Sequence, residues 1–227
     1  MKNTGTKIIY EEGVYREYLY TGLLGYLFRY QHKILSPDYL LDKQKVLEIG
    51  PSFEPHIKFK QLNYSEYHCI DINESPELIE YYEKNFTNIF FNSYDGKKIK
   101  YPDNTFDRII ISHTLEHILD PEIFINEMLR VLKPNCCISV ALPCDNGFFW
   151  RLGRFILKKT YHKRKGTLEI DYNYTMAKEH VNTIFQLLSI LEKKYFIKDQ
   201  KFIPFGIRSP DLNLIYVCHI FKNSELD

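Results

Sequence analysis

The sequence has no excess of charge of either sign. Thirty Lys and Arg side chains stand against 29 Asp and Glu, which leaves a formal net charge of +1 over 227 residues. A protein that holds nucleic acid through its phosphates needs a basic surface. The overall charge therefore argues against nucleic acid as the partner, and any basic surface must be local.

Long apolar runs and paired cysteines are also missing. No stretch of 18 uncharged apolar residues occurs, so no membrane-spanning helix is predicted, and the first residues lack the apolar region of a secretion signal. The five cysteines form no Cys-x-x-Cys pair, and most lie in or beside apolar runs. Buried, reduced thiols are expected there instead of a zinc site, and we expect a cytoplasmic protein.

Strand-like and helix-like segments alternate through most of the chain. The predicted strands are residues 45–50, 67–72, 89–91, 107–112, 137–142, 201–205 and 213–221. A helix is expected to begin after Ser75, with Pro76 in its first turn, and another at Asp120, which Lys133-Pro134-Asn135 should end. The alternation predicts an α/β, Rossmann-like, doubly wound sheet of seven strands. It should be mostly parallel, with the last strand antiparallel, because only a short loop joins the last two strands.

The length and the 44% hydrophobic content fit one domain, residues 1–227. We divide it into an N-terminal helical cap (1–40), a cofactor-binding core (41–143), an insertion after strand five (144–176) and a last helix with two strands (177–227). Aromatic residues over 10–35 predict one or two amphipathic helices. These helices either pack on the sheet or cover the ligand, and both alternatives stay open.

The turn after the first predicted strand indicates a nucleotide-like ligand. Val46-Leu47-Glu48-Ile49-Gly50 ends an apolar strand in a glycine that lets the backbone approach a ligand closely. Asp71 ends the second strand 21 residues later, where a carboxylate can accept the hydroxyls of a ribose. On these residues alone, a dinucleotide-binding enzyme fits equally well.

A longer series of motifs decides between a dinucleotide-binding enzyme and a protein that binds another nucleotide-like ligand. Asp95-Gly96, Tyr101 to Asp107, Ser112 to His117 and Glu127 to Asn135 follow in order. With Gly50 and Asp71, the series resembles class I S-adenosylmethionine-dependent methyltransferases, particularly the group that includes ubiquinone-biosynthesis methyltransferases. The resemblance covers about residues 41–143.

The resemblance implies a cofactor site for S-adenosyl-L-methionine. It places Glu48 and Gly50 at the methionine end, with Ser52 of the same loop as a further cofactor contact, and Ser112 and His113 beside the methionine and the transferred methyl group. It assigns Asp71 to the ribose, Ile72 to packing on the adenine, Asp95 to the adenine amino group, and Gly96 to a backbone contact. In the first loop, Ser52 and Glu54 stand where relatives have glycine. Asn135 replaces another glycine, and Asn tolerates the left-handed backbone expected there.

Catalysis at oxygen or nitrogen needs a group that can take the acceptor's proton. We favour His180, at the expected start of the last long helix, for this role, with His113 and His117 next, although each can also be a structural hydrogen-bonding residue. Asp145, Trp150, Arg151 and Glu179 are the expected substrate residues. No metal is expected. An alternative comes from a resemblance to metal-dependent O-methyltransferases with Glu-x-x-Glu-His, and its ligands would be His113, Glu116, His117 and His180.

The insertion should determine the acceptor. Phe148 to Leu157 is apolar and aromatic, and Lys158 to Lys165 is basic. Such a segment can touch an anionic membrane or a phosphorylated acceptor, or it can form a lid with a solvated basic end. It is similar to insertions in methyltransferases of bacterial surface-polysaccharide synthesis.

We therefore expect methyl transfer to O or N of a small-molecule or glycan-linked acceptor, with peripheral membrane contact as a further expectation. The alternatives are an RNA methyltransferase and a catalytically silent S-adenosylmethionine-binding module. The sequence gives no indication of oligomeric state.

Overall fold

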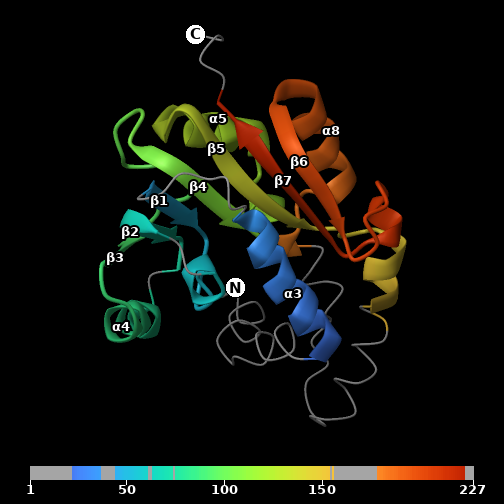
Figure 1. Cartoon of the computed structure of the whole chain (residues 1–227), viewed down its shortest axis with the longest axis horizontal. Helices are drawn as coiled ribbons and strands as arrows, with labels where there is room; N and C mark the ends of the chain where they lie inside the picture. The colour runs from blue at the N-terminus through green and yellow to red at the C-terminus, as the bar shows by residue number, and fades with distance from the viewer. Residues whose placement is uncertain are drawn as a thin grey trace.

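A seven-stranded sheet forms the centre of the computed structural model (Figure 1). The structure describes residues 22–36, 44–60, 63–73, 75–153, 155 and 178–222. In chain order the strands are β1 (Gln44–Ile49), β2 (Tyr64–Asp71), β3 (Ile89–Ser93), β4 (Phe106–Ser112), β5 (Leu132–Pro143), β6 (Phe196–Ile203) and β7 (Ile215–Phe221). Their order across the sheet is β3-β2-β1-β4-β5-β7-β6. The first five are parallel, and β7 runs antiparallel to β5 and β6. The predicted sheet is confirmed.

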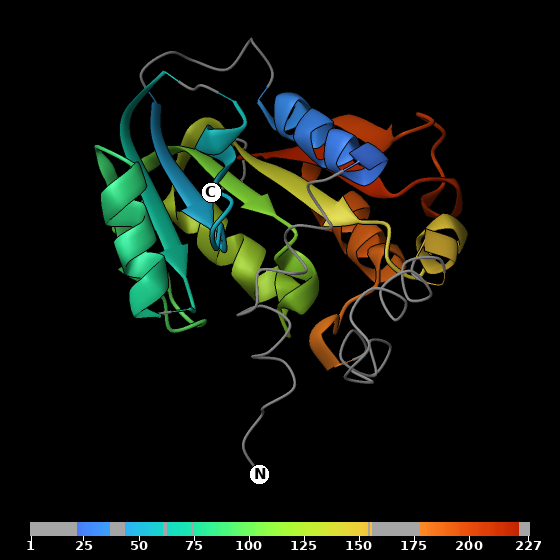
Figure 2. The ribbon, with the colours of Figure 1, turned by 90° about the horizontal axis from the view of Figure 1, so that it is seen from below.

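Helices cover both faces of this sheet (Figure 2). They are α3 (Gly22–Leu35), α4 (Pro76–Asn85), α5 (Pro121–Val131) and α8 (Ile184–Lys194). The predicted starts of two helices are confirmed, because Ser75 caps α4 and Asp120 caps α5 with their side chains. In the part of the chain that the structure describes, no helix has the length and apolar character to span a membrane.

The core lies on both sides of the sheet, as the apolar strand sequences require. Ile109 and Ile111 in β4 belong to a cluster with residues of α5 and α8, whereas Ile110 packs with the residues of α4 on the opposite face. Successive side chains of a strand point to opposite faces. The three consecutive isoleucines therefore mark a central strand that is buried on both sides.

Two predicted boundaries are wrong. Lys133-Pro134-Asn135 was expected to end the helix as a turn, but α5 ends at Val131 and β5 begins at Leu132, which pairs with Phe106. Asn135 does have the expected left-handed backbone, with φ +59°. The long helix near the end begins only at Ile184, because Thr183 and Gln186 form a reciprocal capping box there. His180 therefore precedes that helix.

The strand ends near the C-terminus also differ from the prediction. The sixth strand begins at Phe196 and ends at Ile203, whereas 201–205 was expected. Phe205 and Gly206 belong to the connection to β7, where Asn213 accepts the N–H of Phe205 through its side chain. The loop between the last two strands lies where it was predicted, but its boundaries differ from the prediction.

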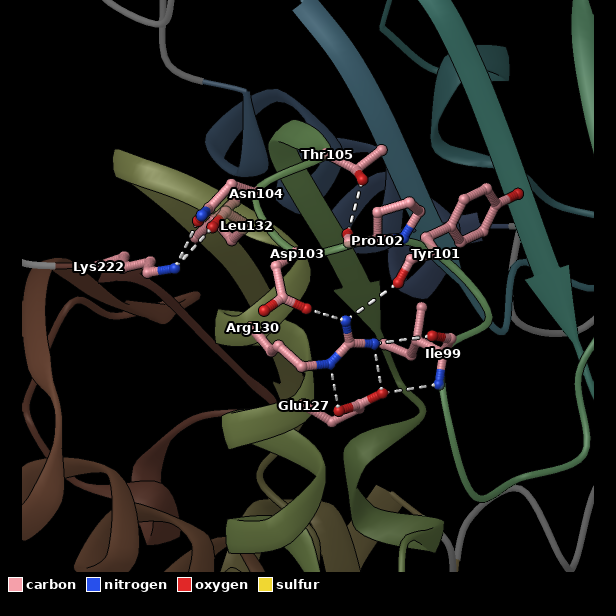
Figure 3. Close-up of polar contacts among 10 residues, drawn as sticks. All are labelled: Ile99, Tyr101, Pro102, Asp103, Asn104, Thr105, Glu127, Arg130, Leu132 and Lys222. Carbon is pink, nitrogen blue, oxygen red and sulfur yellow. Dashed lines mark hydrogen bonds and ion pairs between the residues drawn. The ribbon is translucent and has the colours of Figure 1, made fainter. Parts of the chain in front are cut away.

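The connection from β3 to β4, residues 94–105, contains no helix and is held by Arg130 of α5 (Figure 3). The guanidinium donates to Glu127 and to the carbonyl oxygens of Ile99 and Tyr101, at distances of 2.8 to 3.0 Å. Glu127 in turn accepts the N–H of Ile99 at 3.0 Å. These contacts fix the connection without a helix of its own, and they give Arg130 a structural role.

Helix α3 is anchored to the sheet by a buried arginine. Arg108 of β4 donates to the carbonyl oxygen of Leu35 in the last turn of α3, and to the hydroxyl of Ser139 on β5. That hydroxyl lies 3.0 Å from Nδ1 of His219 on β7. A cation at the end of a helix satisfies carbonyl groups that have no partner within the helix. The predicted N-terminal helical segment thus packs on the sheet, although residues 1–21 and 37–43 lie outside the described part.

Candidate functional site

The site lies where the parallel strands end and the strand order reverses, between β1 and β4. Open α/β sheets bind ligands at this point, because the connections on either side leave in opposite directions. Three residues here have a left-handed backbone: Gly50 with φ +68°, Ser52 with φ +46° and His113 with φ +52°. For Ser and His this conformation costs free energy, and such residues gather at functional sites.

Gly50 cannot be replaced without a clash. A Cβ atom on Gly50 would lie 2.5 Å from the hydroxyl oxygen of Thr114, the residue that follows β4 by two positions. The N–H of Gly50 donates to the carbonyl of Ile70 at 2.8 Å, which extends the β1–β2 pairing into the turn. The turn therefore brings the ends of β1, β2 and β4 together.

Ser52 stands where relatives have a second glycine, and hydrogen bonds hold its backbone in place. Its N–H donates to Oδ2 of Asp71 at 2.9 Å, and its carbonyl accepts from the hydroxyl of Tyr82 at 2.9 Å. The backbone N–H of Asn73 donates to the other oxygen, Oδ1, of Asp71 at 2.9 Å. Asp71 is only 7% exposed, and this burial raises the pKa of its carboxyl group. The carboxylate predicted to hold the ribose thus also supports the first loop.

The predicted adenine contacts lie together on the next two loops. Ile72 is 73% exposed, which is unusual for its apolar side chain. A Cβ placed on Gly96 would lie 3.9 Å from the side chain of Ile72, so these two positions are neighbours. Asp95 is exposed, and its Oδ1 accepts the N–H groups of Lys97 and Lys98. An apolar surface beside a carboxylate suits a flat ring that carries an amino group.

Glu48 is enclosed instead of facing the loop. Its carboxylate is 2% exposed and accepts the N–H of His56 at 2.8 Å and the hydroxyl of Tyr67 at 2.6 Å. Burial raises the pKa of Glu48 to about 7, because desolvation disfavours the charged form more than the two hydrogen bonds favour it. In this structure Glu48 supports the loop from within the fold.

A pair of buried histidines next to Glu48 was not predicted. Nδ1 of His32 on α3 lies 2.9 Å from Nδ1 of His56, and the hydroxyl of Ser36 contacts the other nitrogen of His56. Burial lowers the pKa of His32 to about 3 and that of His56 well below its usual value. Neither spacing nor periodicity in the sequence indicates this pairing, since only the docking of α3 creates it.

His113 is oriented by α3. Its Nε2 lies 2.8 Å from Oε1 of Gln31, whose amide nitrogen donates to the hydroxyl of Ser112 at 3.3 Å. The ring of Phe28 lies 4.9 Å away, centroid to centroid. Burial lowers the pKa of His113 to about 3, so the ring is neutral and Nε2 carries the hydrogen that Gln31 accepts. The sequence analysis placed Ser112 and His113 here but missed Gln31.

Four of the other predicted catalytic and substrate residues meet in one cluster beyond β4 and β5, and they are His117, Asp145, Glu179 and His180. His180 Nδ1 pairs with Asp145 Oδ2, and Nδ1 of His117 donates to the carbonyl of Glu179 at 2.9 Å. The rings of His117 and His180 lie 4.8 Å apart and nearly perpendicular. Glu116 lies beside them, 2% exposed, and its Oε1 is 4.0 Å from Nε2 of His117. Residues more than 60 positions apart in the chain thus share one polar site.

Trp150 and Arg151 lie on a short helical turn, residues 148–153, that follows Asp145. Trp150 is partly buried and Arg151 is exposed, and the N–H of Arg151 donates to the carbonyl of Gly147 at 3.0 Å. The basic part of the predicted insertion, Lys158 to Lys165, lies outside the described residues. The expectation that the insertion selects the acceptor stays a prediction.

Comparison with known proteins finds methyltransferases among the matches. Residues 47–140 match the family model described as a methyltransferase domain. The chain is 43% identical over 47 residues to the ubiquinone/menaquinone biosynthesis C-methyltransferase of Saccharophagus degradans, which covers 21% of this chain and 19% of that protein. It is 32% identical over 78 residues to ajmaline N-methyltransferase of Rauvolfia serpentina, covering 32% and 27%. The chain thus aligns with less than a third of the length of either relative.

A solved structure extends the likeness to most of the fold. The S-adenosylmethionine-dependent methyltransferase of Mesorhizobium loti superposes with a TM-score of 0.56 at 16% identity, over 84% of this chain and 95% of that one. At this identity the likeness shows the fold alone. The sequence match over residues 47–140 and this shared fold both support the class I S-adenosylmethionine-dependent methyltransferase domain that the motifs predicted. The cofactor of this class is S-adenosyl-L-methionine, as the motifs implied.

Proposed function

We propose that the protein transfers a methyl group from S-adenosylmethionine to an oxygen or nitrogen atom of a small-molecule or glycan-linked acceptor. The observation that carries this proposal is the arrangement of two neighbouring sites. The predicted cofactor contacts follow β1, β2 and β3, and a separate polar cluster with His117 and His180 follows β4 and β5. One site suits the donor, and the other suits an acceptor that must be activated.

Methyl transfer from a sulfonium is an in-line displacement, so alignment of the two reactants supplies much of the rate. In this proposal the cofactor lies across the turn at Gly50, with its ribose on Asp71 and its adenine against Ile72. Its methionine end then points toward Ser112 and His113. The left-handed backbones at Gly50 and His113 turn the chain away from the strand ends and support this placement.

The acceptor is activated by the histidines in this proposal. An O–H or N–H acceptor must lose its proton during transfer. His180 is our first assignment for this activation, because Asp145 holds its ring in one orientation, and His117 and His113 come next. The names of the matched relatives do not decide the acceptor atom, since one is called a C-methyltransferase and another an N-methyltransferase.

A glycan-linked acceptor at a membrane fits the surface beside this cluster. Phe148 and Phe155 are 52% and 58% exposed on the turn after Asp145, and Phe205 on the neighbouring β6–β7 connection is 60% exposed. The ring of Phe149 links the two segments, with its centroid 5.9 Å from that of Phe205. Exposed aromatic groups next to a basic sequence favour contact with anionic headgroups.

The predicted cytoplasmic location is part of the same proposal. All five cysteines are free, and four of them are buried. Burial raises the pKa of Cys144 and Cys218 to about 12, which keeps these thiols protonated and unreactive. Free thiols fit a reducing compartment.

Calorimetry with S-adenosylmethionine and S-adenosylhomocysteine tests the donor site. The Asp71→Ala variant should lose binding of both ligands, whereas Glu80→Ala, which removes an exposed carboxylate from α4, should bind both like the unchanged protein. His180→Ala should bind S-adenosylmethionine normally and turn over more slowly. Absence of binding to the unchanged protein would overturn the proposal.

A screen for labelled methyl groups identifies the acceptor class. Nucleotide sugars, lipid-linked glycans and RNA are incubated with the protein and labelled S-adenosylmethionine. Labelling of either of the first two supports the proposal. Labelling of RNA, with binding that weakens as salt rises, would support the RNA methyltransferase. Cofactor binding without labelling of any acceptor would support the silent binding module.

A further inference from the structure

Two adjacent side chains of helix α3 contact the loops on either side of the point where the strand order reverses. Gln31 contacts the end of β4, because its Oε1 lies 2.8 Å from Nε2 of His113. His32 contacts the segment after β1, because its Nδ1 lies 2.9 Å from Nδ1 of His56. Successive side chains of a helix point about 100° apart, so one helix can contact both loops. Helix α3 therefore links the two loops between which the cofactor is expected to bind.

The amide of Gln31 contacts two consecutive residues at the end of β4. Its nitrogen donates to the hydroxyl of Ser112 at 3.3 Å, so its oxygen is left to accept the hydrogen on Nε2 of His113. The ring of Phe28, one turn earlier on the same side of α3, lies 4.9 Å from the ring of His113, centroid to centroid. Two side chains of α3 thus hold the imidazole of His113, whose own backbone is left-handed with φ +52°.

The docking of α3 onto the sheet has other contacts to support it. Apolar side chains of α3 pack against β5, β6 and β7, and Arg108 donates to the carbonyl of Leu35. Gln31 is 0% exposed in this interface, where an apolar side chain would pack without the cost of burying an amide. The hydrogen bonds to Ser112 and His113 offset that cost. The presence of an amide at this position therefore indicates a role at the end of β4.

The chemistry of the cofactor explains why an oriented, neutral imidazole is useful there. S-adenosylmethionine carries a positive charge on its sulfur, and a neutral ring beside it avoids a contact between like charges. Burial lowers the pKa of His113 to about 3, which keeps the ring neutral. Transfer of the methyl group also depends on alignment, so a ring held in one orientation is favourable.

We propose that Gln31 is a positioning residue of the cofactor site, and that it couples the docking of α3 to the binding of S-adenosylmethionine. This inference rests on the proposed placement of the cofactor beside Ser112 and His113. Coupling is reciprocal, so a helix that orients the site for the cofactor is itself stabilised when the cofactor binds. Helix α3 then packs on the sheet and contributes to the ligand site at the same time.

Calorimetry with S-adenosylmethionine tests the role of the amide. Gln31→Met keeps the length of the side chain and removes both hydrogen bonds, and it should weaken binding about 5- to 30-fold. The matched control is Lys33→Ala, which removes an exposed side chain from the same helix and should bind like the unchanged protein. Unaltered binding by folded Gln31→Met would overturn the inference.

Nitrogen NMR of the histidine rings separates positioning from folding. In the unchanged protein His113 should show one neutral tautomer, with its hydrogen on Nε2, and the signal is assigned by its absence from His113→Gln. In Gln31→Met the two neutral tautomers should mix, because Nε2 has lost its acceptor. A single Nε2–H tautomer that persists in folded Gln31→Met would overturn the assigned contact.

Hydrogen exchange of the unchanged protein tests the coupling without any variant. Bound S-adenosylmethionine should slow exchange in α3 more than in α8, which packs on the opposite face of the sheet. The comparison is needed because a ligand that stabilises the whole fold slows both helices alike. If Gln31→Met does not fold, this measurement decides. Equal slowing of α3 and α8 would overturn the inference.

The outcomes separate this inference from the proposed function. Normal cofactor binding by Gln31→Met, together with methyl transfer to a glycan or nucleotide sugar, refutes the role of Gln31 and leaves the methyltransferase intact. Coupling of α3 to the cofactor in a protein that labels no acceptor supports the inference and refutes the proposed function. Absence of S-adenosylmethionine binding to the unchanged protein overturns both.

Discussion

Replacing Glu48 with Gln should change how the stability of the protein depends on pH. In the folded chain the pKa of Glu48 is about 7, compared with an ordinary value of 4.5. Below pH 4.5 the carboxyl is protonated in both the folded and the unfolded chain. Between pH 4.5 and 7 the unfolded chain releases the proton while the folded chain keeps it, so stability falls as pH rises. Above pH 7 the loss is constant.

The size of this loss follows from the shift. One pKa unit corresponds to about 1.4 kcal/mol, so the buried carboxyl lowers the free energy of unfolding by about 3 kcal/mol at pH 8 relative to pH 4. Glutamine does not titrate, and its carbonyl can still accept the N–H of His56. The difference in stability between Glu48→Gln and the unchanged protein should therefore move by about this amount in favour of the variant across the interval.

Urea denaturation at half-unit steps from pH 4 to pH 8 measures this difference, and other titrating groups cancel in the subtraction. A second variant, Tyr67→Phe, removes the hydroxyl that lies 2.6 Å from Glu48 Oε2 and favours its charged form. It should shift the transition to higher pH. A difference between Glu48→Gln and the unchanged protein that stays flat over the whole range would refute the reasoning.

Two further substitutions test the loops. Gly50→Ala should cost about 1–2 kcal/mol for its left-handed backbone, and more because of the contact with Thr114. Adding Thr114→Ala should recover only the steric part, as measured by denaturation, and a double variant no more stable than Gly50→Ala would contradict the assigned clash. Arg130→Met should cost about 1–2 kcal/mol, because its hydrogen bonds to Glu127 and to the β3–β4 connection (Figure 3) are partly exposed. Faster hydrogen exchange at the amide of Ile99 should accompany it, and unchanged exchange there would exclude this role.

Local sequence signals predicted most of the fold. Ser75 and Asp120 mark helix starts by their own side chains, and the apolar stretch around Ile110 marks a strand buried on both faces. These features depend on residues a few positions apart. The end of α5 was harder, because Leu132 joins the sheet through its pairing with Phe106, a partner that local sequence does not reveal.

The residues of the candidate site were predicted from the sequence, but the contacts that orient them were not. The sequence analysis named Asp71, His117 and His180, and the structure places the two histidines in contact. The residues of α3 that contact the site histidines were not predicted. Gln31 reaches His113 from a helix 82 positions away, and His32 reaches His56 across 24. Neither pair has a periodic pattern, since both arise only when α3 docks on the sheet.

Asp71 accepts two hydrogen bonds from the backbone, and these bonds bear on how the first loop can bind a cofactor without the glycines that its relatives have. Each carboxylate oxygen has a second lone pair, so a ribose can add to the contacts with Ser52 and Asn73 without displacing them. These hydrogen bonds hold the loop in its shape, so little conformational entropy should be lost when a ligand binds. A glycine-rich turn can adjust its backbone to a ligand, whereas the backbone of this turn is held in one conformation by its hydrogen bonds to Asp71. Cofactor affinity here should depend on the anchoring carboxylate more than on the number of glycines.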